Sequence, residues 1–147
     1  MRKNSNLNMQ SGSTMNMYSG SAMNVISGAS VNFTGAAYNK KSELNMNKYS
    51  RLNMNNGSSM YMSGAQMYAQ NGALINVDET SQIYNNGTIE VTGLGSSIKL
   101  GKDALLEVGN KNGGGQSASV YVHSGSSMTV ENGATLTVPT PPLPSAD

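Results

Sequence analysis

The chain has 147 residues, of which 37% are hydrophobic and 12% are charged, about half the usual charged share of ~25%. This length suits one domain, and the absence of cysteine excludes a disulfide framework and a thiolate metal site. The sequence contains no run of 18 apolar residues, so it predicts no insertion into a membrane. The net charge of +1 conceals a gradient, since residues 1–51 carry six basic residues and one acidic residue (+5) and residues 52–147 carry three and seven (−4).

One unit of about eight residues repeats about sixteen times between Leu7 and Val138: apolar, polar, apolar, then a turn of Ser, Gly, Asn or Ala. Apolar residues at i and i+2 share one face of a strand, whereas an amphipathic helix needs them at i, i+3, i+4 and i+7. The repeat therefore predicts short strands joined by tight corners. In chain order the expected inward pairs are Leu7/Met9, Met15/Met17, Met23/Val25, Val31/Phe33, Leu44/Met46, Leu52/Met54, Met60/Met62, Met67/Ala69, Ile75/Val77, Ile83/Asn85, Ile89/Val91, Ile98/Leu100, Leu106/Val108, Val120/Val122, Met128/Val130 and Leu136/Val138.

Two insertions interrupt the period, at Ala36–Glu43 after the fourth copy and at Gly109–Ser119 after the thirteenth. Nine copies separate them, so with three strands per turn both insertions leave the same corner. We therefore predict an all-β, single-domain parallel β-solenoid (β-helix) over residues 1–138, triangular, with about 24 residues per turn and a height of about 25 Å at a strand spacing of ~4.8 Å. Residues 139–147, which hold all four prolines, are expected to form a tail, a linker or a cap on the last strand edge.

The residue between each inward pair points outward, and a three-strand turn arranges these residues in rows. One expected row is Asn24, Asn53, Asn76, Lys99 and Thr129; a second is Asn8, Asn32, Tyr61, Tyr84, Glu107 and Thr137; the third is Asn16, Asn45, Tyr68, Glu90 and Tyr121. Stacked asparagines can form an amide ladder, although asparagine is also a tolerated outward residue in a chain of this composition. The candidate surface contacts are Tyr61, Tyr68, Tyr84 and Tyr121, and a basic-aromatic patch made of Lys40, Lys41, Lys48, Arg51, Tyr38 and Tyr49.

Residues that carry catalytic chemistry are sparse. His123 is the only histidine and follows a strand, in a corner, so neither a histidine-based triad nor a multi-histidine metal site is indicated. The eleven methionines fall mostly at inward positions of the first eight copies, where they are expected to fill the core. We predict no cofactor, no metal and no enzymatic activity.

The segments NNGTIEVTG and SGSSMTVENGATLTV (Ser124 to Val138) resemble the β-solenoid passenger regions of bacterial autotransporters and related surface adhesins. The resemblance lies in the style of repeat along most of the chain, and it implies a secreted or surface-displayed stalk, adhesin or fibre segment without transferred catalytic residues. A short solenoid with a proline-bearing tail is also similar to the bactofilins, which form cytoskeletal polymers in bacteria.

The leading prediction is a structural subunit of an extracellular fibre or surface adhesin that stacks head to tail through its open ends, with the chain itself as partner. Opposite charge at the two ends and an N-terminal turn without a visible cap favour this function. The alternatives are a module that binds glycans or a surface, with ice binding disfavoured because the outward rows are irregular, and then a polysaccharide-processing enzyme. Nucleic acid is not expected as a partner, and a cytoplasmic location stays open.

Overall fold

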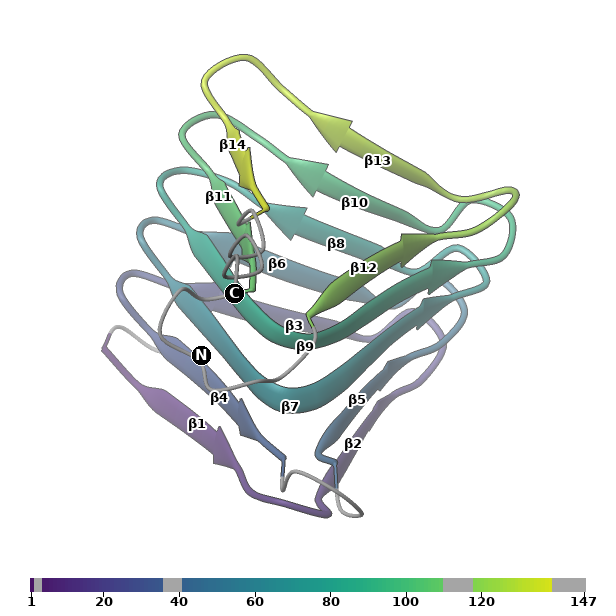
Figure 1. Cartoon of the computed structure of the whole chain (residues 1–147), viewed down its shortest axis with the longest axis horizontal. Coiled ribbons are helices and arrows are strands. Elements are labelled where there is room, and N and C mark those ends of the chain that lie inside the picture. The colour runs from purple at the N-terminus through teal and green to yellow at the C-terminus, as the bar shows by residue number, and fades with distance from the viewer. Residues whose placement is uncertain (2–3, 36–40, 110–117, 139–147) are drawn as a thin grey trace, which may run out of the picture.

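The computed structural model describes residues 1, 4–35, 41–109 and 118–138. Over these residues the chain forms fourteen β-strands and no helix, and every strand pair is parallel (Figure 1). The prediction of an all-β fold with parallel sheets is therefore confirmed. The strands are β1 (Asn6–Met9), β2 (Thr14–Met17), β3 (Ala22–Ile26), β4 (Ser30–Thr34), β5 (Glu43–Met46), β6 (Arg51–Asn55), β7 (Ser59–Gln70), β8 (Leu74–Val77), β9 (Gln82–Thr92), β10 (Ser97–Leu100), β11 (Leu105–Val108), β12 (Ser119–Val122), β13 (Ser127–Val130) and β14 (Thr135–Thr137).

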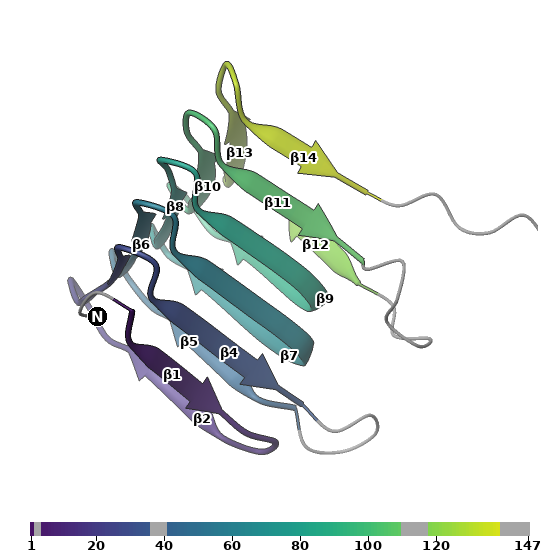
Figure 2. The ribbon, with the colours of Figure 1, turned by 90° about the vertical axis from the view of Figure 1, so that its left-hand side faces the viewer.

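Hydrogen-bonded strands form three columns, and in Figure 2 the first of them faces the viewer, with β1, β4, β7, β9, β11 and β14 stacked in that order. The first column is β1, β4, the first part of β7, the first part of β9, β11 and β14. The second column is β2, β5, the second parts of β7 and β9, and β12. The third column is a five-stranded sheet of β3, β6, β8, β10 and β13. The first two columns belong to one nine-stranded sheet because the long strands β7 and β9 bend and contribute to both.

The pairing register follows the repeat. Leu7 pairs with Val31, 24 positions later, and Leu52 pairs with Ile75, 23 positions later. The offset grows to 29 for Met15 and Leu44, because the first insertion lies between them. Both insertions connect a strand of the first column to a strand of the second, β4 to β5 and β11 to β12, as their spacing predicts.

Two of the predicted corners are wrong. The inward pairs of residues 60–62 and 67–69 lie on one continuous strand, β7, and the pairs at 83–85 and 89–91 lie on another, β9. The register of these two strands shifts between Ser63 and Gln66, where each strand bends. The bend brings the backbones close together, since a Cβ on Gly87 would lie 2.1 Å from the carbonyl oxygen of Ala65. Only glycine fits at that position.

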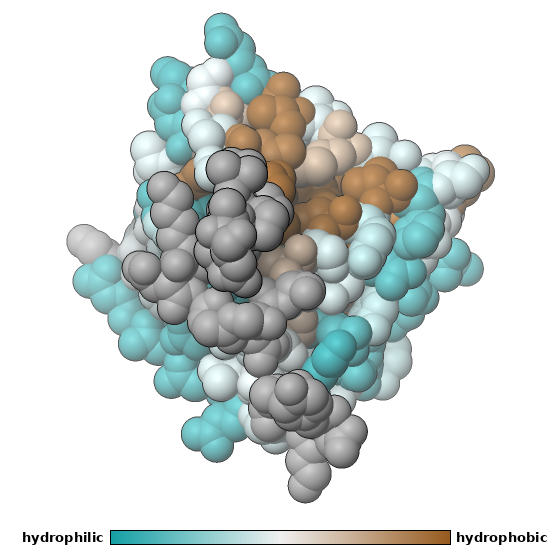
Figure 3. All heavy atoms as spheres, viewed as in Figure 1, coloured by the Kyte–Doolittle hydropathy of each residue, from teal (hydrophilic) through white to brown (hydrophobic). Residues whose placement is uncertain are grey.

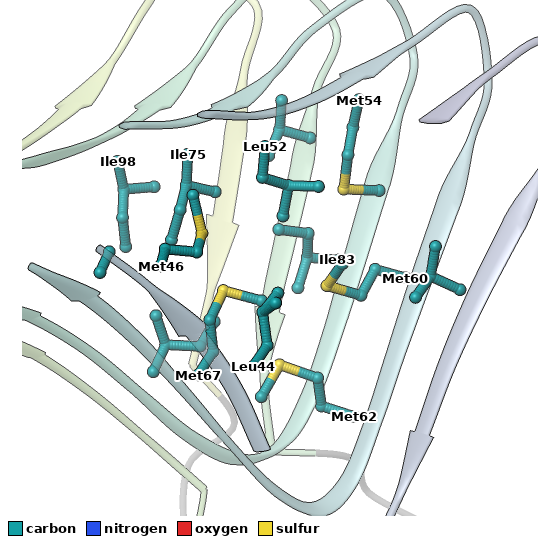
Figure 4. Packing of buried hydrophobic residues seen from close by; sticks show 14 of the residues in the cluster. Leu44, Met46, Leu52, Met54, Met60, Met62, Met67, Ile75, Ile83 and Ile98 are labelled. Carbon is teal, nitrogen blue, oxygen red and sulfur yellow. The ribbon is translucent and has the colours of Figure 1, made fainter. Parts of the chain in front are cut away.

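The core is a stack of the inward residues of all three columns (Figure 4). Methionines fill much of the core in the N-terminal half of the stack, as expected from the sequence: Met46, Met54, Met60 and Met67 are fully buried. Small residues close the corners on the inside, and Ser58 there donates a hydrogen bond to Ser81 Oγ (3.2 Å). The inside is therefore narrow and filled by ladders of similar side chains rather than by a globular interior.

One inward position is polar. Asn85, paired with Ile83 in the repeat, is 1% exposed. Its Nδ2 donates to the Ser119 carbonyl (3.0 Å), and its Oδ1 accepts from the Gly87 backbone N–H (2.9 Å). This amide ties the start of β12, which follows the second insertion, to the bend of β9. A buried polar side chain is tolerated here because its hydrogen bonds are made inside the protein.

Candidate functional site

The C-terminal end of the stack is formed by β12, β13 and β14. Each of these strands pairs with a single described strand, namely β9, β10 and β11 in the same order. Their inward residues are exposed because no described layer covers them: Val122 is 41% exposed, Val130 45% and Leu136 42%. Figure 3, viewed as Figure 1, shows hydrophobic residues gathered in the region of β12, β13 and β14, with hydrophilic residues around them. Val138, expected as an inward partner of Leu136, lies beyond β14 and is also exposed.

The N-terminal end is formed by β1, β2 and β3, which pair on one side with β4, β5 and β6. A hollow of about 500 Å³ lies between them, lined by apolar side chains that include Leu7, Met15 and Met23. These three residues are only partly buried, whereas their counterparts one layer further on, Val31, Leu44 and Leu52, are fully buried. Both ends thus present apolar surface and strand edges.

The N-terminal end is not entirely open, which corrects the expectation of an uncapped first turn. The ammonium group of Met1 donates a hydrogen bond to the carbonyl oxygen of Asn24, in β3. The Met1 side chain also packs against the core. Residue 1 therefore covers part of β3, while no described residue pairs with the outer edges of β1 and β2.

The charge gradient lies along the stack rather than at its end surfaces. From Asn4 to Gly35 the first layer has no charged side chain, and Arg2 and Lys3 lie outside the described residues. The described basic residues of the N-terminal half, Lys41, Lys48 and Arg51, lie in the next layer. At the other end, Glu131 is neutralised by Lys99 (2.9 Å), and this contact raises the pKa of the Lys99 ammonium. The described end surfaces are consequently mainly apolar rather than charged.

The three outward rows are confirmed residue by residue. Asn24, Asn53, Asn76, Lys99 and Thr129 are successive partners in the third column. The rows from Asn8 to Thr137 and from Asn16 to Tyr121 are equally continuous.

Amide hydrogen bonds run along these rows in one direction. In the third column, Asn76 Nδ2 donates to Asn53 Oδ1 (2.8 Å), and Asn53 Nδ2 donates to Asn24 Oδ1 (2.8 Å). In the other columns, Asn32 donates to Asn8 (2.7 Å) and Asn45 donates to Asn16 (3.1 Å). Every amide ladder thus donates toward the N-terminal end.

Two of the four predicted tyrosines lie together. The rings of Tyr61 and Tyr84 stack with centroids 5.0 Å apart and planes 7° from parallel. The Tyr84 hydroxyl donates to Gln82 Oε1 (2.6 Å). Burial raises the pKa of the Tyr84 phenol, and Tyr61 and Glu107 raise it further. Because the facing ring surfaces cover each other, this pair offers ring edges rather than a broad platform for a sugar.

The other two tyrosines lie in the second column with Glu90 between them. Burial raises the pKa of the Tyr68 phenol, and the carboxylates of Glu43 and Glu90 add to the effect. Glu90 also contacts the exposed His123 (3.2 Å), whose ring is tilted against that of Tyr121. The structure therefore distributes the four tyrosines over two columns and does not assemble them into one site.

The basic-aromatic patch is also divided. Lys41 precedes β5, and Lys48 and Tyr49 follow it in the next corner, on the order of 20 Å away at ~3.3 Å per residue. The Tyr49 ring lies against Gly72, in the corner stacked next to its own. Lys40 and Tyr38 lie outside the described residues.

The structure offers no assembled centre for metal chemistry in residues 1, 4–35, 41–109 and 118–138, where no three His, Cys, Asp or Glu side chains could hold an ion together. In the part of the chain that is described, no helix is long and apolar enough to cross a membrane. No family model, curated protein or solved structure matches the chain. The ends of the stack, rather than a side-chain cluster, are therefore the candidate functional surfaces.

The repeat does not predict the exposure of the inward residues at the C-terminal end. Val122, Val130 and Leu136 continue the repeat and are therefore expected in the core, but they are exposed. The available signal was their position in the last three copies, which have no later copy to cover them.

Proposed function

We propose that this chain is a three-sided parallel β-solenoid that stacks head to tail on copies of itself, as a structural subunit of an extracellular fibre or surface adhesin. The constant offset of 22 to 24 residues between paired segments that no insertion separates supports a single coil. The placement of both insertions between the first and second columns supports a three-strand turn.

The main support for this function is that both ends of the stack expose apolar side chains and strand edges that pair with no other described strand. Three strand edges at the C-terminal end expose Val122, Val130 and Leu136, and three at the N-terminal end surround an apolar hollow. Exposed parallel edges are templates for pairing with another chain, and solenoids need capping repeats to stay apart. Stacking of ends buries both the edges and the apolar surface.

Sedimentation velocity over a concentration series tests this function. We expect the native chain to form larger species as its concentration rises. A Val130→Lys variant places a charge on the C-terminal end and is expected to stay monomeric. A matched Leu94→Lys variant replaces an apolar residue that is 86% exposed on a side corner, one layer below the corner of Gly125 and outside the end surface, and should assemble like the native chain. A native chain that is monomeric at every concentration refutes the proposal.

A further inference from the structure

We infer that a second copy docks rotated by one column, so that its β1 pairs with β12, its β2 with β13 and its β3 with β14. This inference rests on the proposed stacking and specifies its geometry. It assigns a particular residue on one copy to each end residue of the other, which the stacking proposal alone does not do.

The rotation follows from the number of strand segments. The first column holds six segments, and the second and third hold five each. The chain therefore ends in the column in which it begins, with β14 above β11 and β1 below β4. The strand that would continue the coil after β14 therefore lies directly above β12, in the second column. If β1 of a second copy takes this place, its β2 lies above β13 and its β3 above β14. No other rotation places all three strands directly above a strand of the first copy. An unrotated copy lays β1 on β14 and leaves an empty layer above β12 and β13.

Inward side chains at this joint are of matching kind. Leu7 and Met9 of the incoming copy lie over Val120 and Val122, and Met15 and Met17 lie over Met128 and Val130. The inward residues of the incoming copy thereby cover the exposed inward residues of the C-terminal end, as each layer covers the layer before it elsewhere in the stack. The partly buried Leu7 and Met15 gain the cover that they lack at the N-terminal end.

Outward side chains match by hydrogen-bond polarity. Asn53 accepts from one neighbouring amide and donates to the other. Asn8, Asn16 and Asn24 each accept in the same way, so their Nδ2 donors face the N-terminal end. The last outward residues at the opposite end, Tyr121, Thr129 and Thr137, all carry hydroxyl oxygens, which accept hydrogen bonds. The rotated joint sets Asn16 on Thr129 and Asn24 on Thr137.

Met1 sets the order of docking. It covers part of β3 through its bond to Asn24, whereas no described residue pairs with the outer edges of β1 and β2. We therefore assign the first contacts to β1 on β12 and β2 on β13. Pairing of β3 with β14 then requires Met1 to leave Asn24.

Cysteine cross-linking distinguishes the three possible rotations, because the native chain has no cysteine. Three double variants are compared: Asn16→Cys with Thr129→Cys for the rotated joint, Asn8→Cys with Thr137→Cys for the unrotated joint, in which β1 lies on β14, and Asn16→Cys with Thr137→Cys for the opposite rotation. Adjacent strands lie about 4.8 Å apart, within the Cα separation that a disulfide accepts. Within one chain, Asn8 and Thr137 lie five layers apart, about 24 Å at that spacing, so only contact between copies can join them.

After mild oxidation and denaturing electrophoresis, we expect a ladder of covalent multimers from the Asn16/Thr129 variant alone. The corresponding single-cysteine variants are limited to dimers. A ladder from the Asn8/Thr137 or the Asn16/Thr137 variant, or none from any variant while the native chain assembles, overturns the rotated joint and leaves stacking in place. A native chain that does not assemble overturns the proposed function itself.

Discussion

Replacement of Asn85 by alanine tests whether the second insertion is anchored by this one buried amide. The substitution leaves the Ser119 carbonyl and the Gly87 N–H without their side-chain partner, in a site where Asn85 is 1% exposed. An orphaned buried polar group costs about 1–3 kcal/mol, so we expect the free energy of unfolding to fall by about 2–4 kcal/mol. That loss is a large part of a typical stability of about 5–15 kcal/mol.

Urea unfolding followed by circular dichroism measures the change. With a slope of about 2 kcal/mol per molar urea, the midpoint should fall by about 1–2 M. The matched control is Asn76→Ala, which removes one amide hydrogen bond from an outward row and should cost less than about 1 kcal/mol. Equal midpoints for the Asn85 variant and the native chain would refute the anchoring role, as would equal losses in the two variants.

Three further substitutions test the packing and the outward rows. Gly87→Ala should destabilise by several kcal/mol or prevent folding, since its Cβ meets backbone, whereas Gly20→Ala, with φ +72 and nothing within 4 Å, should cost only about 1–2 kcal/mol of backbone strain in thermal unfolding. Met60→Ala should lower the free energy of unfolding by about 2–5 kcal/mol, because Met60 is fully buried; a loss below 1 kcal/mol contradicts the assigned core. The raised pKa of Tyr84 means that the unfolded chain loses its phenol proton first, so stability should fall as pH rises above about 10. Tyr84→Phe should reduce this alkaline loss, measured as the urea midpoint at about pH 9 and about pH 11, and an unchanged loss in the variant would contradict the role of Tyr84.

Much of the strand layout can be predicted from the sequence because each repeat carries the same local pattern. Apolar residues at i and i+2 predict a strand and the face that turns inward, and the Ser-Gly or Asn-Gly that follows predicts a corner. The outward rows then follow from the three-strand turn that the spacing of the insertions indicates. The prediction of separate strands around Gly64 and Gly87 was wrong because a small residue in this pattern suits either a corner or a bend. That choice depends on how closely two backbones approach in space.

The candidate surfaces were less predictable because they depend on whether a neighbouring layer of strands covers a residue. Leu136 and Val130 have the same sequence signature as buried residues such as Leu106, and only their place in the last layer exposes them. Likewise, Lys41 and Lys48 are near in sequence but separated by a strand. The contact of Met1 with Asn24 joins residues 23 positions apart and has no local signal.

Electron microscopy of the purified chain tests end-to-end stacking most directly. Sixteen strand segments in three columns correspond to about 26 Å of height per chain at a spacing of ~4.8 Å. Stacking predicts filaments one chain wide, with strands perpendicular to the axis and one subunit every ~26 Å. A uniform field of single particles about 26 Å tall, at every concentration and salt level, would contradict it.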